Sequence, residues 1–188
     1  MKESGGTLVI SLDFELMWGM FDVVSKSNYE ANLKGVYTVI PKILEMFSDH
    51  EVAATWATVG MLMYKDKNDL LRSMPKEDNL PSYLRSELSA YNHLKNNPTI
   101  EEKDTSYFAP TLVQKICSTK DQELASHTFS HYYCLEEQSN SDSLSDKFSH
   151  DCEAFAEIVR QYNQPIKSIV FPRNQWSKDC LLYTSDAA

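Results

Sequence analysis

The chain has 188 residues, of which 42% are hydrophobic, and this size and composition suit one domain with a real core. Its formal net charge of −9, from 27 acidic and 18 basic residues, argues against a nucleic-acid partner, because such partners call for a basic face. The sequence has no run of the roughly 18 to 20 apolar residues that a membrane span needs, no apolar signal core at its N-terminus and no CxxC pair among its four cysteines, so we expect a cytoplasmic protein with free thiols.

Segments typical of buried strands alternate along the chain with segments typical of helices. The first, "TLVISLDFE" at 7–15, is β-branched and apolar without alternation, as in a strand covered on both faces. Further strand candidates lie at 51–62, 122–131 and 166–172. Apolar residues at helical spacing mark two ranges, 29–50 (most clearly in its second half) and 144–162, and 82–95 and 109–119 are further helix candidates. This order predicts an α/β fold with parallel strands and crossover helices.

Two further features of the sequence are a long polar insertion and the apolar face of its last helical range. A polar stretch at about 62–110 carries four prolines, and an insertion of this length is typical of a functional loop or a lid. In the last helical range, apolar residues recur on one face and are expected to enter the core: Phe148, Cys152, Phe155, Ile158 and Val159.

Polar side chains follow three of the predicted strands at the point where each strand ends. Asp13 and Glu15 end the first strand, His127 and His131 the third, and Arg173 follows the fourth. The carboxyl ends of parallel strands meet at one edge of a sheet, where α/β proteins gather their chemistry. We therefore expect these groups to lie close together.

The histidine pair suggests a metal site. Imidazoles at i and i+4 face the same way where the backbone is helical or turning, and a carboxylate then completes the His₂-carboxylate set of a catalytic zinc site. Taken alone, the HxxxH spacing is weak evidence. An acidic pair at a strand end is often only solvated, and Arg173 alone could be a structural ion-pair partner.

In combination, these residues resemble a known family, the polysaccharide deacetylases with a NodB homology domain, also called carbohydrate esterase family 4. That family has an acidic strand-end motif, usually TFDD, then a strand like ATFFxxG, here "ATWATVG" at 54–60. Its H-[ST]-x-x-H motif is here "HTFSH" at 127–131, and its third motif, usually RxPY, has its nearest match in "VFPRNQ" at 170–175. The motifs keep the family's order over about residues 7–176.

The resemblance implies roles for the acidic and histidine positions. The first Asp of the family's acidic motif is the catalytic base, which makes Asp13 the candidate. Phe14 stands where TFDD has its second Asp, and branches with a D-x-D or D-x-E pattern skip one residue. Glu15 is then the metal ligand, together with His127 and His131.

Further residues are candidates for the site, an arginine by the same resemblance and aromatic residues by their position near the motifs. Arg173 takes the place of the third-motif arginine that orients the base, although its offset from Pro172 departs from RxPY. Trp18, Tyr132 and Tyr133 are candidates to line a sugar site, with packing in the core or at the rim as the alternative reading.

The family's fold is an irregular (β/α) barrel, and we expect this barrel to be incomplete here. Four strands are predicted, and the leucine–histidine motif that supplies the family's general acid is missing after Arg173. Residues 1–178 are thus expected to form a partial NodB-like deacetylase domain with the polar insertion at about 62–110. The ending "CLLYTSDAA" resembles read-through of adapter DNA, and we expect 179–188 to be a non-native tail.

The resemblance implies a metal-dependent hydrolase that removes N-acetyl groups from an N-acetylated sugar or glycan precursor. In the family, metal-activated water attacks the acetamide carbonyl, and the metal and a backbone N–H stabilise the oxyanion. Zn²⁺ is the expected ion, although such sites accept several divalent ions. Two alternatives stay open: a hydrolase of another non-peptide C–N bond on the same fold, and an inactive carbohydrate-binding relative. The incomplete chain could itself lack turnover.

Overall fold

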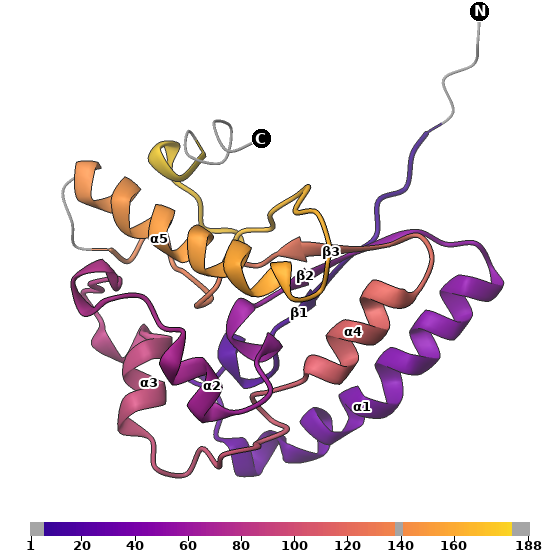
Figure 1. Ribbon diagram of the computed structural model, residues 1–188, viewed down its shortest axis with the longest axis horizontal. Helices are drawn as coiled ribbons and strands as arrows, with labels where there is room; N and C mark the ends of the chain where they lie inside the picture. The colour runs from indigo at the N-terminus through magenta and orange to yellow at the C-terminus, as the bar shows by residue number, and fades with distance from the viewer. Residues whose placement is uncertain (1–5, 138–140, 182–188) are drawn as a thin grey trace, which may run out of the picture.

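The computed structural model describes residues 6–137 and 141–181, with the backbone alone for 141–145. Within these residues, three strands form a parallel sheet in the order β1-β2-β3 (Figure 1). They are β1 (Ser11–Phe14), β2 (Ala54–Thr58) and β3 (Gln122–Ser126). Phe14 pairs with Thr58, and Thr58 with Ser126, so the carboxyl ends of all three strands are level. The predicted α/β fold with parallel strands is confirmed.

The fourth predicted strand, at 166–172, is wrong as a strand, although the segment lies beside β3. Among the described residues it meets the sheet in one parallel bridge, Ser126↔Ile169, flanked by backbone hydrogen bonds of 2.8 and 3.0 Å. Pairing ends there because Pro172 has no N–H to donate and Arg173 turns the chain with a φ angle of 51°. The described part of the chain is thus an open sheet, and the expected barrel does not appear in it.

Five α-helices accompany the sheet in the described ranges: α1 (Lys26–Asp49), α2 (Lys67–Arg72), α3 (Ala90–Asn96), α4 (Pro110–Ser118) and α5 (Ser141–Arg160). α1 and α4 lie side by side (Figure 1). α1 begins before the predicted range because Ser25 caps it, its hydroxyl accepting a hydrogen bond from the backbone N of Asn28 at 3.4 Å. The helix predicted at 82–95 is shorter, and a 3₁₀ turn at Ser86–Leu88 precedes it.

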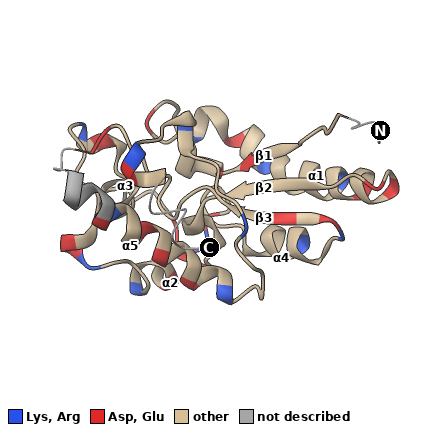
Figure 2. Ribbon diagram, turned by 90° about the horizontal axis from the view of Figure 1, so that it is seen from above, with Lys and Arg blue, Asp and Glu red and all other residues tan. Residues whose placement is uncertain are grey.

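The polar insertion lies beyond the carboxyl ends of the strands, where Figure 2 shows α2 and α3. It has its own buried side chains, including Leu70, Tyr91 and Leu94. It is also bonded to the rest of the chain, because Met17 N donates to Ser106 O at 3.0 Å and the indole N–H of Trp18 to Tyr107 O at 2.8 Å. The insertion is therefore a packed layer over the strand ends.

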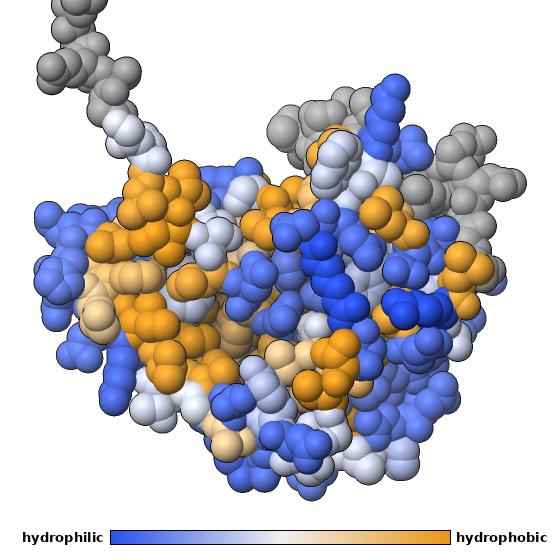
Figure 3. Space-filling view, turned by 180° about the vertical axis from the view of Figure 1, so that it is seen from behind, coloured by the Kyte–Doolittle hydropathy of each residue, from blue (hydrophilic) through white to orange (hydrophobic). Residues whose placement is uncertain are grey.

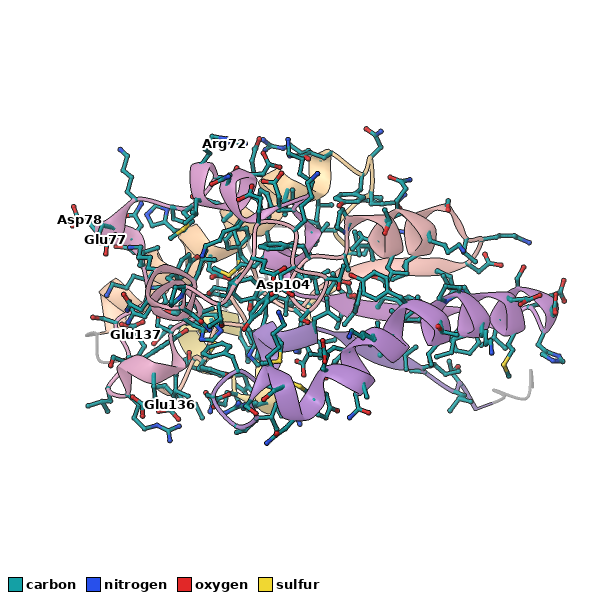
Figure 4. All side chains as sticks on the ribbon, turned by 90° about the horizontal axis from the view of Figure 1, so that it is seen from below. Arg72, Glu77, Asp78, Asp104, Glu136 and Glu137 are labelled. Carbon is teal, nitrogen blue, oxygen red and sulfur yellow. The ribbon has the colours of Figure 1, made fainter. Side chains whose placement is uncertain are left out.

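Acidic residues gather at the outer end of this layer. Figure 4 shows Glu77, Asp78, Glu136 and Glu137 toward the same end of the view. Both carboxylate oxygens of Glu137 accept a hydrogen bond from the backbone N of Ser82 at 2.9 Å, and Glu137 forms an antiparallel bridge with Tyr83. These contacts tie the insertion to the segment that follows the two histidines.

The expected apolar face of α5 is confirmed. Phe148, Phe155, Ile158 and Val159 are at most 2% exposed, and Cys152 is half-buried. Across the described residues, no helix combines the length and apolarity that crossing a membrane requires.

Candidate metal centre

Three side chains from two strand ends converge on one point. Glu15 follows β1, and His127 and His131 follow β3. Oε2 of Glu15 lies 3.1 Å from Nε2 of His131 and 3.5 Å from Nε2 of His127. The imidazoles are buried, at 1% and 2% exposure, whereas the Glu15 side chain is 25% exposed. The arrangement is a set of one carboxylate and two imidazoles that opens to solvent on the Glu15 side.

The two histidines are brought together by a tight turn. His127 N continues the sheet ladder by donating to Thr58 O at 3.0 Å. Thr128 and His131 then adopt positive φ angles of 61° and 56°, and Thr128 Oγ1 accepts a hydrogen bond from Tyr132 N at 2.7 Å. The imidazole centroids end 5.2 Å apart. An i, i+4 pair of imidazoles can converge on a helix or on a turn, and here the backbone between the two histidines is a turn.

A glycine makes room for this turn. Gly60, at the end of the "ATWATVG" motif, donates its backbone N–H to Thr128 O at 3.0 Å. A Cβ atom at Gly60 would lie 3.0 Å from the Cα of Phe129 and 2.7 Å from a carbon of its ring. The close approach of the two backbones therefore requires a residue without a side chain.

A second glycine makes room for the carboxylate. Glu15 precedes a 3₁₀ helix, η1 (Leu16–Gly19), which returns Gly19 beneath the Glu15 side chain. A Cβ atom at Gly19 would lie 2.0 Å from Cδ of Glu15 and 2.2 and 2.4 Å from its two oxygens. Gly19 thus leaves the space that the Glu15 carboxylate occupies.

A buried carboxylate on α5 holds the turn from behind. Asp151, 2% exposed, accepts hydrogen bonds from Phe129 N at 2.6 Å, from Ser130 N at 3.2 Å and from the hydroxyl of Ser130. Burial raises the pKa of Asp151 to about 6, although these hydrogen bonds act in the opposite direction. Phe129 and Ser130 lie between the two histidines, so Asp151 fixes the backbone that separates them.

Each imidazole has a partner for its second nitrogen. Nδ1 of His127 lies 2.8 Å from the carbonyl oxygen of Val170, and Nδ1 of His131 lies 2.9 Å from the hydroxyl of Tyr133. Metal-binding histidines almost always have such a partner, which orients the ring and leaves Nε2 for the ion. Both Nε2 atoms face Glu15 here.

The distances and protonation states fit a divalent ion. Two ligand atoms about 2.0 to 2.1 Å from a tetrahedral ion are about 3.3 Å apart, and the observed N–O distances of 3.1 and 3.5 Å bracket that value. Burial lowers the pKa of His131, which favours the neutral imidazole that metals bind. Burial of Glu15 raises its pKa, but the close contact with the two imidazoles outweighs this and lowers it to about 2, so the carboxylate is ionised.

Arg173 lies next to the centre and pairs with a residue that the sequence did not indicate. Its Nη2 donates to Oδ1 of Asp22 at 2.6 Å, and the Asp22 side chain is 7% exposed. The guanidinium carbon lies 4.8 Å from the ring centroid of Tyr133, the residue that contacts His131. Arg173 is thus joined to Asp22 and Tyr133, rather than to Asp13.

Asp13 lies outside the group of Glu15 and the histidines but on the same groove as Glu15. It is exposed on β1, and its side chain makes no hydrogen bond or ion pair with the described residues. The groove, of about 530 Å³, runs between β1 and α1, and Asp13, Glu15 and Trp56 are among its lining residues. Figure 3 shows hydrophobic residues gathered on this side of the molecule, next to the N-terminal segment.

The expectation that Trp18 and Tyr132 line a sugar site is corrected by their burial. Both are 0% exposed. The indole N–H of Trp18 donates to Tyr107 O at 2.8 Å, and the Tyr132 ring packs against Phe148 with centroids 5.4 Å apart. Both rings belong to the core, because η1 and the histidine turn fold them inward.

The sequence reasoning missed several residues around the centre. Asp151 carried a readable signal, since it occupies the apolar face of α5 between Phe148 and Phe155, where a carboxylate is unexpected unless it is hydrogen-bonded. Asp22 and Gly19 carried none, because their roles depend on contacts made only in the folded chain, and Tyr133, read from the sequence as a sugar-site or packing residue, contacts His131.

Comparisons with known proteins agree with this architecture. No protein-family model and no curated protein matches the sequence. Among solved structures, the deacetylase domain of BpsB from Bordetella bronchiseptica has a TM-score of 0.53 at 14% identity, over 95% of this chain and 60% of that one. The chain shares the fold of the polysaccharide deacetylases. The resemblance read from the motifs is therefore confirmed at the level of the fold.

Two further structures are similar over 95% of this chain. One is the deacetylase PplD of Streptococcus pyogenes in complex with acetate, with a TM-score of 0.48, 10% identity and 51% of that chain covered. The other is BA3943, a CE4 family pseudoenzyme from Bacillus anthracis, with a TM-score of 0.46, 15% identity and 40% of that chain covered. The chain spans 40% to 60% of the length of the three structures.

Proposed function

We propose that this chain carries the metal centre of a hydrolase that removes N-acetyl groups from an N-acetylated sugar or glycan. The observation that supports this function is the convergence of Glu15, His127 and His131, with Nε2–Oε2 distances of 3.1 and 3.5 Å. The shared fold supports deacetylase chemistry, because the chain resembles the BpsB deacetylase domain over 95% of its length. We also propose that the open sheet is part of an irregular (β/α) barrel, since Ile169 makes one parallel bridge with Ser126 at the edge of β3.

Each residue of the centre has a proposed task. Glu15, His127 and His131 hold the ion, and Zn²⁺ is the proposed one, because two imidazoles and a carboxylate form a set that leaves one position open. When bound, the ion supplies Lewis acidity and lowers the pKa of water. Asp13 shares the groove with Glu15 and is the proposed base that accepts the proton of the attacking water. Arg173 is proposed to act as a positioning residue at the centre through its contacts with Asp22 and Tyr133.

Metal content is the first test. Wild type and His127→Ala are exposed to Zn²⁺, freed of loosely held ions with a weak chelator, and analysed for metal per chain. We expect about one ion per wild-type chain and a loss in His127→Ala. His150→Ala is the matched control, because His150 is a partly exposed residue of α5 that pairs with Glu153 at 3.0 Å. Folded wild type that retains no ion would refute the centre.

Acetate release is the second test. Zinc-loaded wild type is incubated with N-acetylglucosamine oligosaccharides, and acetate is measured against time. We expect release that requires the metal and is absent in His127→Ala. Metal retention without release from any N-acetylated glycan would refute hydrolysis by this chain and leave the metal centre standing.

A second candidate is a glycan-binding protein without turnover. The observation that favours it is the exposed, unbonded side chain of Asp13 in the described structure, since catalytic bases are usually held by neighbouring groups. Under this candidate, zinc-loaded wild type binds an N-acetylated oligosaccharide in calorimetry and releases no acetate. Asp13→Asn then leaves the binding constant unchanged, whereas under the first candidate Asp13→Asn abolishes acetate release.

A further inference from the structure

The two imidazoles of the centre differ in the group that their Nδ1 atom contacts. His127 Nδ1 faces the backbone carbonyl of Val170, which can only accept, so this contact requires a proton on Nδ1 and leaves Nε2 for a metal. His131 Nδ1 faces the hydroxyl of Tyr133, which can donate or accept. The tautomer of His131 therefore depends on how the Tyr133 hydroxyl is turned.

Three contacts hold the Tyr133 ring in position. It is 1% exposed, and its backbone N donates to the hydroxyl of Tyr83 at 3.0 Å. Its ring meets the His131 ring edge-on, with centroids 5.0 Å apart. The Arg173 guanidinium covers it at 4.8 Å and is itself held by Asp22 at 2.6 Å. The hydroxyl of Tyr133 thus stays within 2.9 Å of Nδ1.

We infer that Tyr133 is a positioning residue of the metal centre, whose hydroxyl accepts the Nδ1 proton of His131 and so presents Nε2 to the ion. The inference rests on the proposed function, because it needs the metal centre. It also gives Arg173 and Asp22 a task, since their pair keeps the Tyr133 ring against His131. The opposite arrangement, with the hydroxyl donating, would put a proton on Nε2 and oppose metal binding.

The test compares Tyr133→Phe with wild type and with Tyr132→Phe. Tyr133→Phe removes one oxygen and retains the ring that Arg173 covers. Tyr132→Phe is the matched control, because Tyr132 is its buried neighbour and its hydroxyl lies 3.2 Å from Glu137, away from the imidazoles. Zn²⁺ affinity is measured by competition with a chromophoric chelator. We expect Tyr133→Phe to bind zinc about 10- to 100-fold more weakly than wild type, and Tyr132→Phe to match wild type within about threefold.

A second measurement reads the tautomer directly and uses wild type alone. Long-range ¹H–¹⁵N spectra of zinc-loaded, ¹⁵N-histidine-labelled protein are expected to show a protonated Nδ1 on both His127 and His131. A Tyr133→Phe variant that folds and binds zinc as wild type does would overturn the inference, and so would a His131 that binds through Nδ1. Wild type that binds no zinc at all would instead remove the metal centre, so the two failures are distinguishable.

Discussion

Gly19→Ala is predicted to disable the metal centre without unfolding the protein. The new Cβ atom would lie 2.0 Å from Cδ of Glu15, and ordinary contact begins at 3.4 Å, so the carboxylate must move by about 1.4 Å. Metal–ligand distances tolerate only about ±0.2 Å. The displaced group is the end of a flexible side chain, so we expect it to yield while the backbone stays. Gly19 has an ordinary φ, and alanine favours a helical backbone by up to about 1 kcal/mol.

The assay combines zinc affinity with the free energy of unfolding of the metal-free protein. We expect Gly19→Ala to bind zinc at least about 100-fold more weakly, a larger loss than for an outer contact, while unfolding in urea stays within about 1 kcal/mol of wild type. Gly35→Ala is the control, because nothing lies within 4 Å of a Cβ atom at Gly35, in α1. Wild-type zinc affinity in Gly19→Ala would refute the placement of Glu15, and an unfolded variant would refute the claim that the carboxylate yields.

The remaining predictions concern the residues that support the centre. Gly60→Ala should destabilise the fold by about 1 to 3 kcal/mol in urea unfolding, because its Cβ would press on the Phe129 backbone. Trp18→Phe should cost about 1 to 3 kcal/mol by leaving the Tyr107 carbonyl unpaired, with zinc affinity unchanged; altered affinity with intact stability would contradict a core role. The pKa of Asp151 is raised to about 6, so its contribution to the free energy of unfolding should fall by up to about 3 kcal/mol as the pH rises from about 4 to about 6. Asp151→Asn should flatten that part of the stability–pH curve, and an unchanged slope would contradict the raised pKa.

The sign of the Asp151 effect follows from its buried state. Burial favours the neutral carboxyl, so the folded chain keeps this proton to a higher pH than the unfolded chain, whose Asp has a pKa of about 3.9. Folding is then favoured most at low pH and loses that advantage as the pH passes the folded pKa. A carboxylate held by a salt bridge would give the opposite slope.

The parts of the fold that were predictable are those set by local pattern. Continuous β-branched runs located the three strands, and helical spacing located α5 and the second half of α1. The positions of Glu15 and His131 at strand ends followed from parallel topology, because it places the carboxyl ends of strands along one edge. These inferences need only near neighbours in the sequence.

The parts that were not predictable depend on partners far along the chain. The segment at 166–172 has strand-like composition, yet Pro172 and the turn at Arg173 limit it to one bridge. Arg173 reads as an orienting residue for Asp13, and its partner proved to be Asp22, which no local pattern marks. For Trp18 the sequence left a sugar site and packing as alternatives, and η1 turns the ring into the core.

The centre is assembled from segments that meet only when the sheet is complete. Glu15 comes from the end of β1, and His127 and His131 come from a turn that Asp151 of α5 holds. Val170 and Tyr133 contact the Nδ1 atoms of the two imidazoles. A chain with β1 displaced loses the carboxylate, and one with α5 displaced loses the spacing of the imidazoles. Zinc should therefore bind the native arrangement and not the unfolded chain, so bound zinc should raise the free energy of unfolding, by about 2.7 kcal/mol at a free concentration 100 times its Kd.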